Sequence, residues 1–569
     1  MRESIRKATA HNLTDHRYNR IPMDRRDFLT LAPSRKRTTT VSGSRTFTGL
    51  DAYTGAWGTA QVVHLLKRAM FGAAPLDVRH FEGMSMDAAV DALLTTNTIP
   101  LTPPVNNYNT GGYTDPTGVV PGAPWVTAPD GDEDLNRKRH SSYKAWWTGQ
   151  MLNQERNIHE KMVLFWHNHF ATETNTIADA RFSYGYNVAL RTHALGNFKN
   201  LTKAITLDPG MLVYLNGYLN EKTAADENYA RELLELFTCG KGPDSLYQEE
   251  DVRAAAHVLT GYKVDKVTCT SYFDPTKHDI TNKQFSSWFS NKVISGKTGT
   301  AGTTELDDML GIIFLQHEVA KFICRKFYQF FIYYEIDAGA EASVIEPLAN
   351  IFRAGNYEIK PLLSALFKSE HFYDPLNMSC LIKSPVDFTV GLCREFGVKF
   401  APAANYAQAY QQWTTLQGAA STQQQNIGDP PGVSGWEAYY LAPQFHELWI
   451  NTDTLPKRNM MVDALITTGY NGLSIDPITF ADQMPNPSDP VALVKDSLDV
   501  LYRMGVSEKT RSFLKNSFLL LGQDQDYYWT QAWTAYKADP SNTMNKNTVL
   551  KHLNELYKYI MNLSEYHLA

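Results

Sequence analysis

The amino-acid sequence predicts a mainly α protein, a large multi-helix globular body with a small β-hairpin insertion near residues 263–300. Apolar residues recur at helical spacing through most of the chain after residue 56. Residues 263–303 instead alternate β-branched and aromatic residues with Asn, Ser, Gly and Thr. The composition, 43% hydrophobic and 20% charged over 569 residues, is that of an ordinary globular protein. We therefore expect residues 56–569 to form a single helical domain, with possible sub-domains at 56–262 and 305–569.

Residues 1–55 are predicted to be a basic, disordered tail. The first fifty residues contain 11 Lys and Arg but only 4 Asp and Glu. Asp24 to Thr30 is similar to a twin-arginine export motif, but polar and basic residues follow it instead of an apolar segment. This favours a cytoplasmic location. The remainder of the chain is acidic, which argues against a nucleic-acid-binding body.

The helices are expected in a definite order. Short helices are predicted at 62–71 and 86–94, the second with Ser85 as its N-cap. Residues 98–133 contain seven prolines and form a long loop, which ends in acidic residues suited to a helix start. Further helices are predicted at 135–262, 305–370, 382–397, 404–417, 452–467 and from 490 to the end.

Several familiar functional patterns are incomplete or missing. Gly296-Lys297-Thr298 ends like a phosphate-binding P-loop, but Asn291 stands where its first glycine is required. His317-Glu318 begins a zinc-protease motif whose second histidine is replaced by Lys321. The five cysteines are widely spaced, and no apolar run reaches the roughly 18 residues of a membrane span.

The segment Glu160–Phe170 is the first with chemical potential. In a regular helix Glu160 and His167 share a face, so the carboxylate is expected to hold the imidazole in one tautomer. His167 and His169 point about 200° apart and share a metal only if the helix ends near Trp166. The alternative is two hydrogen-bonded histidines in an aromatic core.

The second such segment is Glu227–Gly240. A helical wheel places its apolar residues on one face, and Gly240 suits the C-cap. The other face has Glu227, Asn228, Arg231, Glu232 and Glu235. This face is either solvated and joined by pairs such as Glu227–Arg231, or the wall of a cleft where Glu232 and Glu235 act as acid and base.

These segments resemble a family of bacterial proteins, the domain-of-unknown-function family 1800. The similarity extends over about 56–560, and its motifs are His64–Gly72, Phe165–Phe170, Glu227–Gly240, Glu250–Arg253, Leu259–Gly261, His278–Phe285, Lys383–Val386, Pro430–Trp436, Trp449–Thr452 and Arg458. The resemblance implies a helical protein of unestablished activity, often exported, with a protein partner of sulfatase-like fold. Cys239, His257 and Tyr262 depart from the family pattern.

Two hypotheses follow. In the first, the protein is an enzyme, a hydrolase by preference, with Glu232 or Glu235 as general acid or base, His167 as partner and Arg231 as anion clamp. Asn228 and Trp436 would bind substrate, and a divalent metal on His167, His169 and Glu232 is a variant. For Trp436 the preferred explanation is an aromatic plug held by a rigid turn, with a stacking surface for substrate as the alternative.

The second hypothesis is a non-catalytic binding or scaffold protein that meets its partner through the loop at 98–133. A weaker third idea is that the basic tail docks onto an acidic surface, either nucleic acid or lipid.

Overall fold

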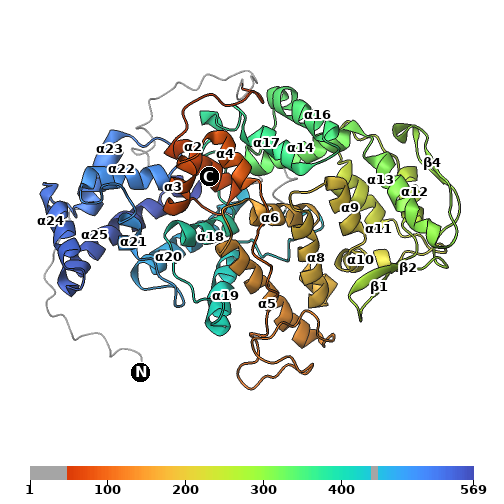
Figure 1. The fold of residues 1–569 in the computed structure, drawn as a ribbon, viewed down its shortest axis with the longest axis horizontal. Coiled ribbons are helices and arrows are strands. Elements are labelled where there is room, and N and C mark those ends of the chain that lie inside the picture. Colours follow the sequence, from red (N-terminus) through yellow and green to blue (C-terminus); the bar gives the residue numbers. More distant parts are fainter. Residues whose placement is uncertain (1–47, 437–445) are drawn as a thin grey trace, which may run out of the picture. The chain divides into compact units, whose positions relative to one another are not determined.

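Helices make up most of the described structure, as the sequence predicts (Figure 1). The computed structural model describes residues 48–436 and 446–569. Asp24 to Thr30, the twin-arginine-like segment, lies outside these ranges. Among the described residues, no helix combines the length and apolarity that a membrane crossing requires.

The first half of the chain contains α2 (Thr59–Ala69), α3 (Pro75–Glu82), α4 (Met86–Leu93), α5 (Glu133–Leu152), α6 (His159–His169), α7 (Thr174–Ile177), α8 (Ala180–His193), α9 (Phe198–Thr206), α10 (Pro209–Tyr214), α11 (Asn228–Glu232) and α12 (Glu249–Val258). The second half contains α13 (Thr304–Ile313), α14 (His317–Phe331), α15 (Ala338–Ala340), α16 (Glu346–Ala354), α17 (Ile359–Phe367), α18 (Pro385–Glu395), α19 (Tyr406–Thr422), α20 (Thr454–Thr467), α21 (Pro477–Ala481), α22 (Pro490–Leu501), α23 (Glu508–Leu514), α24 (Tyr527–Ala538) and α25 (Thr543–Asn562).

The helix starts follow the capping residues read from the sequence. The Ser85 side chain accepts a hydrogen bond from the Ala88 N–H at 3.2 Å, as predicted for the N-cap of α4. Asp132, in the acidic run after the long loop, caps α5 by accepting from the Leu135 N–H at 2.8 Å. The acidic run therefore serves the helix start, where carboxylates satisfy free N–H groups and favour the helix dipole.

The small β insertion is also confirmed. Strands β1 (Tyr262–Asp265) and β2 (Thr270–Phe273) pair antiparallel, with Tyr262 opposite Phe273. Strands β3 (Lys283–Gln284) and β4 (Val293–Ile294) form a second antiparallel pair. The first hairpin packs against α10, and the second packs against α12 and α13 (Figure 1).

The predicted loop before α5 is irregular but folds around a buried ion pair. Asp115 and Arg139 have no side-chain exposure, and Arg139 Nη2 lies 3.2 Å from Asp115 Oδ2. Asp115 also accepts hydrogen bonds from the Tyr108 hydroxyl at 2.8 Å and the Thr117 N–H at 2.7 Å. These contacts compensate the cost of burying the carboxylate and join the loop to α5.

The segment Glu227–Gly240 departs from the regular helix assumed above. The chain is α-helical over α11 and continues as a π-helix, η2 (Leu233–Thr238). The Cys239 N–H accordingly bonds to the Leu234 carbonyl, five residues back, at 2.8 Å. A wheel drawn at 100° per residue is therefore wrong after Leu233, because a π-turn holds more residues. The predicted stop at Gly240 is confirmed by its positive φ of 77°.

Helix α6 positions the candidate residues because it runs through the core. All eleven of its residues are buried. Figure 1 shows α6 between α8 and α18, and it packs against both α5 and α8. Polar groups on such a helix must find partners inside the protein.

Candidate functional site

His167 lies in an aromatic box. Its ring centroid is 5.1 Å from that of Trp147, 5.7 Å from Trp436 and 6.1 Å from Tyr186. Neither ring nitrogen has a hydrogen-bond partner among the described residues. Burial lowers the pKa of His167 to about 3, so the imidazole is neutral near pH 7.

His169 points to a different neighbour, as the 200° separation predicts. Its Nε2 lies 3.0 Å from the Phe237 carbonyl oxygen, and burial lowers its pKa to about 3. The neutral ring thus donates its Nε2 proton to η2, which joins the two segments selected from the sequence. Within the described ranges, no three His, Cys, Asp or Glu side chains are grouped to hold a metal ion.

The expected pair between Glu160 and His167 is not formed. Glu160 makes a two-pronged ion pair with Arg191 of α8, in which Nη2 lies 2.9 Å from Oε2. The Asn97 amide donates to the same carboxylate at 3.1 Å. A fully buried carboxylate gains more from a guanidinium than from a neutral imidazole, which accounts for the difference.

Arg231 takes part in surface ion pairs. Its guanidinium lies 2.9 Å from Glu227 and 2.8 Å from Glu249. The geometry around Arg231 is therefore that of a solvated face joined by ion pairs. The Asn228 amide donates to the Leu215 carbonyl at 3.2 Å, which ties α11 to the end of α10.

Glu232 and Glu235 differ in their surroundings. Glu235 is ion-paired with Lys241, whereas one buried oxygen of Glu232 has no partner among the described residues. Burial, and then the charge of Glu235, raise the pKa of Glu232. The charges that act on His167 are those of Asp429 and Lys144, and neither of its ring nitrogens is hydrogen-bonded to Glu232.

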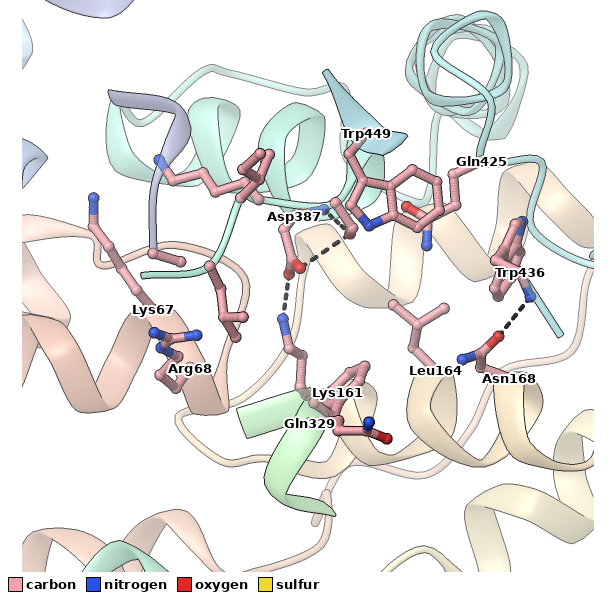
Figure 2. Close-up of a pocket in the computed structure, with 16 residues that line it drawn as sticks. Lys67, Arg68, Lys161, Leu164, Asn168, Gln329, Asp387, Gln425, Trp436 and Trp449 are labelled. Carbon is pink, nitrogen blue, oxygen red and sulfur yellow. Dashed lines mark hydrogen bonds and ion pairs between the residues drawn. The ribbon is translucent and has the colours of Figure 1, made fainter. Parts of the chain in front are cut away.

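A cavity of about 60 Å³ on another face of α6 gathers basic and aromatic side chains. We call it the lysine pocket. Its lining includes Lys67 and Arg68 of α2, Lys161, Leu164 and Asn168 of α6, Phe330 of α14, Lys383, Ser384 and Asp387 at the start of α18, Gln425 after α19, Trp436 and Trp449. In Figure 2, Lys161 reaches Asp387, with Lys67 and Arg68 to one side and both tryptophans to the other.

Five family-like motifs meet at this pocket. Lys67 and Arg68 belong to His64–Gly72, and Asn168 to Phe165–Phe170. Lys383 and Ser384 begin Lys383–Val386, whereas Trp436 ends Pro430–Trp436. Trp449 adds the first residue of a fifth motif, Trp449–Thr452.

Arg458, another residue of the family pattern, contacts two of the segments that line the pocket. It is fully buried, and its Nη2 donates to the carbonyls of Lys383 at 2.9 Å and Trp449 at 3.2 Å. It is a positioning residue, since Lys383 and Trp449 come from segments far apart in the sequence.

The turn before Trp436 fits against α6 only because position 435 is glycine. Gly435 has a φ of +92°, and an added Cβ would overlap the side-chain and carbonyl oxygens of Asn168. The Trp436 N–H donates to Asn168 Oδ1 at 2.8 Å. Trp436 is consequently both a buried plug and a wall of the pocket.

The lysine pocket was not predicted from the sequence. A usable signal was present, since Lys67 and Lys161 occur among apolar residues in helices that periodicity marks as buried. Buried lysines need a counter-charge, so each one is a reason to search for a site.

A second, larger groove of about 1610 Å³ borders the long loop. Its walls include residues 96–103 of the loop, Glu155, Arg156 and the segment 397–404. The groove is compatible with the hypothesis of a binding partner at the loop, which stays a prediction.

The comparisons with known proteins agree with the resemblance. A family model described as "Protein of unknown function (DUF1800)" matches residues 64–568. No curated protein and no solved structure matches the chain.

Proposed function

Because the chain belongs to the DUF1800 family, whose description assigns no activity, we propose a function from geometry: the protein binds a small anion in the lysine pocket. The supporting observation is that motifs from distant parts of the chain direct their basic residues at one cavity. An anion of this kind is a carboxylate or a tetrahedral oxyanion such as phosphate.

The charge balance of the pocket supports this proposal. Lys67, Lys161 and Lys383 are each at least 95% buried, and Asp387 is the one acidic side chain among the described lining residues. A second carboxylate, Glu395, lies behind the wall. Burying charge without enough counter-charge is unfavourable, so a bound anion lowers the free energy of this arrangement.

The size of the cavity limits the ligand. About 60 Å³ admits a few water molecules or one small anionic group. The tryptophan rings and Leu164 close the opposite end with apolar surface (Figure 2). A low-dielectric wall strengthens the attraction between the buried cations and the anion.

The test is isothermal titration calorimetry with acetate, phosphate and sulfate at low ionic strength. The informative variant is Lys161→Met with Asp387→Leu, which removes one cation without leaving its partner unpaired. We expect affinity to fall about tenfold or more, the effect of losing one charge-assisted hydrogen bond. Lys292→Met, at an exposed position, is the matched control. Absence of binding by the unaltered protein would refute the proposal.

A hydrolase is the second candidate, with Glu232 as general acid. The specific observation is its half-buried carboxyl group, with an unpartnered oxygen and a raised pKa beside Glu235. A carboxyl group that stays protonated closer to neutral pH is suited to protonating a leaving group. Glu235, which is ion-paired with Lys241, would be the second carboxyl group of such a site.

Screening of ester, phosphoester and glycoside substrates tests this candidate. Glu232→Gln should abolish any turnover that the unaltered protein shows, whereas Glu227→Gln, on the exposed ion-paired face, should not. Equal activity of the two variants would exclude Glu232 as the acid.

A further inference from the structure

The three buried lysines of the lysine pocket have unequal partners. Lys161 forms a direct ion pair with Asp387. Lys67 donates to the Leu501 carbonyl at 2.6 Å and lies 3.1 Å from Glu395 Oε1.

Among the described residues, Lys383 has only longer contacts. Its Nζ lies 4.0 Å from Glu395 Oε2, beyond hydrogen-bond distance, and 4.0 Å from the centroid of the Tyr566 ring. Lys383 is therefore the one of the three amines that is held by a ring contact and a more distant carboxylate rather than by a hydrogen bond to an oxygen atom.

Glu395 has little capacity left for Lys383. Its Oε2 accepts a hydrogen bond from the Tyr566 hydroxyl at 2.8 Å. Its Oε1 faces Lys67, and the Ala73 N–H donates to it at 3.3 Å. Glu395 is thus the shared carboxylate of two buried amines. Its shorter contacts are with Tyr566, Ala73 and Lys67 rather than with Lys383.

The electrostatic surroundings of Lys383 act in both directions. Burial comes first and lowers its pKa, and Arg458 adds a repulsion. Glu395 and Asp387 oppose this effect. The charged and titratable groups that face Lys383 are Glu395 and Asp387 of α18, Arg458 of α20, Lys67 of α2 and the buried Tyr566 and His567. A lysine beside other cations in a dry pocket is the environment that makes an amine nucleophilic.

We infer that Lys383 is a nucleophilic amine that condenses with the carbonyl group of a small 2-oxo acid. This inference rests on the proposed function, because the other cations of the pocket would hold the carboxylate of the oxo acid. The Lys383 nitrogen attacks the carbonyl carbon, and the C–N bond forms as the C–O bond breaks. The amine gives up both protons, which leave with the oxygen as water, so the product is an imine and no oxidant or reductant is needed.

The experiment is reductive trapping of the full-length protein with pyruvate and cyanoborohydride near pH 7, followed by peptide mapping. Reduction converts the imine into a stable secondary amine on the lysine that formed it. We expect labelling at Lys383 to exceed that at exposed Lys292 by about tenfold or more, because an ordinary lysine is almost fully protonated at this pH. Acetone, which has the carbonyl but no carboxylate, should label Lys383 much less.

Two variants make the test specific. Lys383→Met keeps the length and apolar stem of the side chain and should abolish the preferred label. Lys292→Met should leave labelling of Lys383 unchanged. Thermal unfolding of both variants establishes that each is folded, and excess acetate or phosphate should protect Lys383 in the unaltered protein.

The outcomes separate this inference from the proposed function. Binding of acetate by calorimetry without preferred labelling of Lys383 overturns the inference and leaves anion binding intact. Labelling of Lys383 by acetone as fully as by pyruvate overturns the assignment of a 2-oxo acid. Failure of both anion binding and labelling overturns the two together.

Discussion

The backbone N–H of Trp436 donates a 2.8 Å hydrogen bond to Oδ1 of Asn168. This contact connects the turn before Trp436 to the end of α6, although the two residues are 268 positions apart. One wall of the lysine pocket therefore depends on how closely the turn approaches the helix.

Gly435→Ala should disrupt this approach. The residue has a left-handed φ, and its Cβ would overlap Asn168, so we expect destabilisation of about 1–3 kcal/mol. Chemical denaturation followed by tryptophan fluorescence measures the change. Gly432→Ala is the matched control, since no atom lies within 4 Å of its Cβ position. Equal effects of the two substitutions would contradict the close-approach argument.

Arg139→Met should destabilise the long loop and α5. It leaves the fully buried Asp115 carboxylate without its guanidinium, and breaking such a pair costs about 3–5 kcal/mol. Adding Asp115→Leu should restore much of this loss. Arg137→Met removes an exposed pair with Asp134 and should change stability by less than about 1 kcal/mol. Urea denaturation compares the variants, and a double variant as unstable as the single one would contradict the explanation.

His167→Phe should weaken the dependence of stability on acid. The folded pKa of His167, about 3, lies below its unfolded value of about 6.5, so between these values the unfolded state binds the extra proton. The contribution of His167 is therefore complete above pH 6.5 and is lost as pH falls toward 3. In this pH range the free energy of unfolding of the variant should depend less on pH than that of the unaltered protein, by up to about 1.4 kcal/mol per pH unit. Urea denaturation at about pH 7, 6 and 5 measures this slope, and identical slopes for the variant and the unaltered protein would show that His167 titrates normally.

Asp208→Asn should show the opposite behaviour. Burial raises the pKa of Asp208 to about 7, so its contribution is complete below the unfolded value near 4 and is lost as pH rises through 7. The Asp208 side chain caps α10 through the Met211 N–H, a role that asparagine preserves. The variant should match the unaltered protein in acid and exceed its stability above pH 7 by about 1 kcal/mol or more.

Asp489→Asn is the matched control for this prediction. Asp489 is exposed, also precedes a proline and caps α22 through the Val491 N–H. Its substitution should not produce the gain in stability above pH 7 that is expected for Asp208→Asn. A similar pH dependence in the two variants would show that burial of Asp208 is not the cause.

The sequence predicted well whatever depends on local spacing. The helices expected at 382–397 and 452–467 are found as α18 and α20, because their apolar residues recur at helical intervals. Ser85 and Gly240 were identified as helix ends for the same local reason. The wheel over residues 227–240 failed where the π-turn begins, since spacing alone does not reveal an inserted residue.

Partners across the core were less predictable. Glu160 and His167 belong to one helix, yet Glu160 is paired by Arg191 of α8. The lysine pocket draws on α2, α6, α18 and the segments around Trp436 and Trp449. Helical periodicity orients a side chain but does not tell which distant segment it meets, so motifs with no chemistry of their own were not recognised as one site.

The π-helix η2 determines how the segment Glu227–Gly240 contacts α6. A π-turn is equivalent to one residue inserted into an α-helix, and removing one residue from 233–238 would let the helix relax to regular α geometry. Because the wide turn absorbs the extra residue, the side chains before and after it would keep their directions after such a deletion. The deletion would remove the wide turn itself, which contains the Phe237 carbonyl, the hydrogen-bond acceptor for His169. The inserted residue thus places a backbone acceptor against the histidine helix.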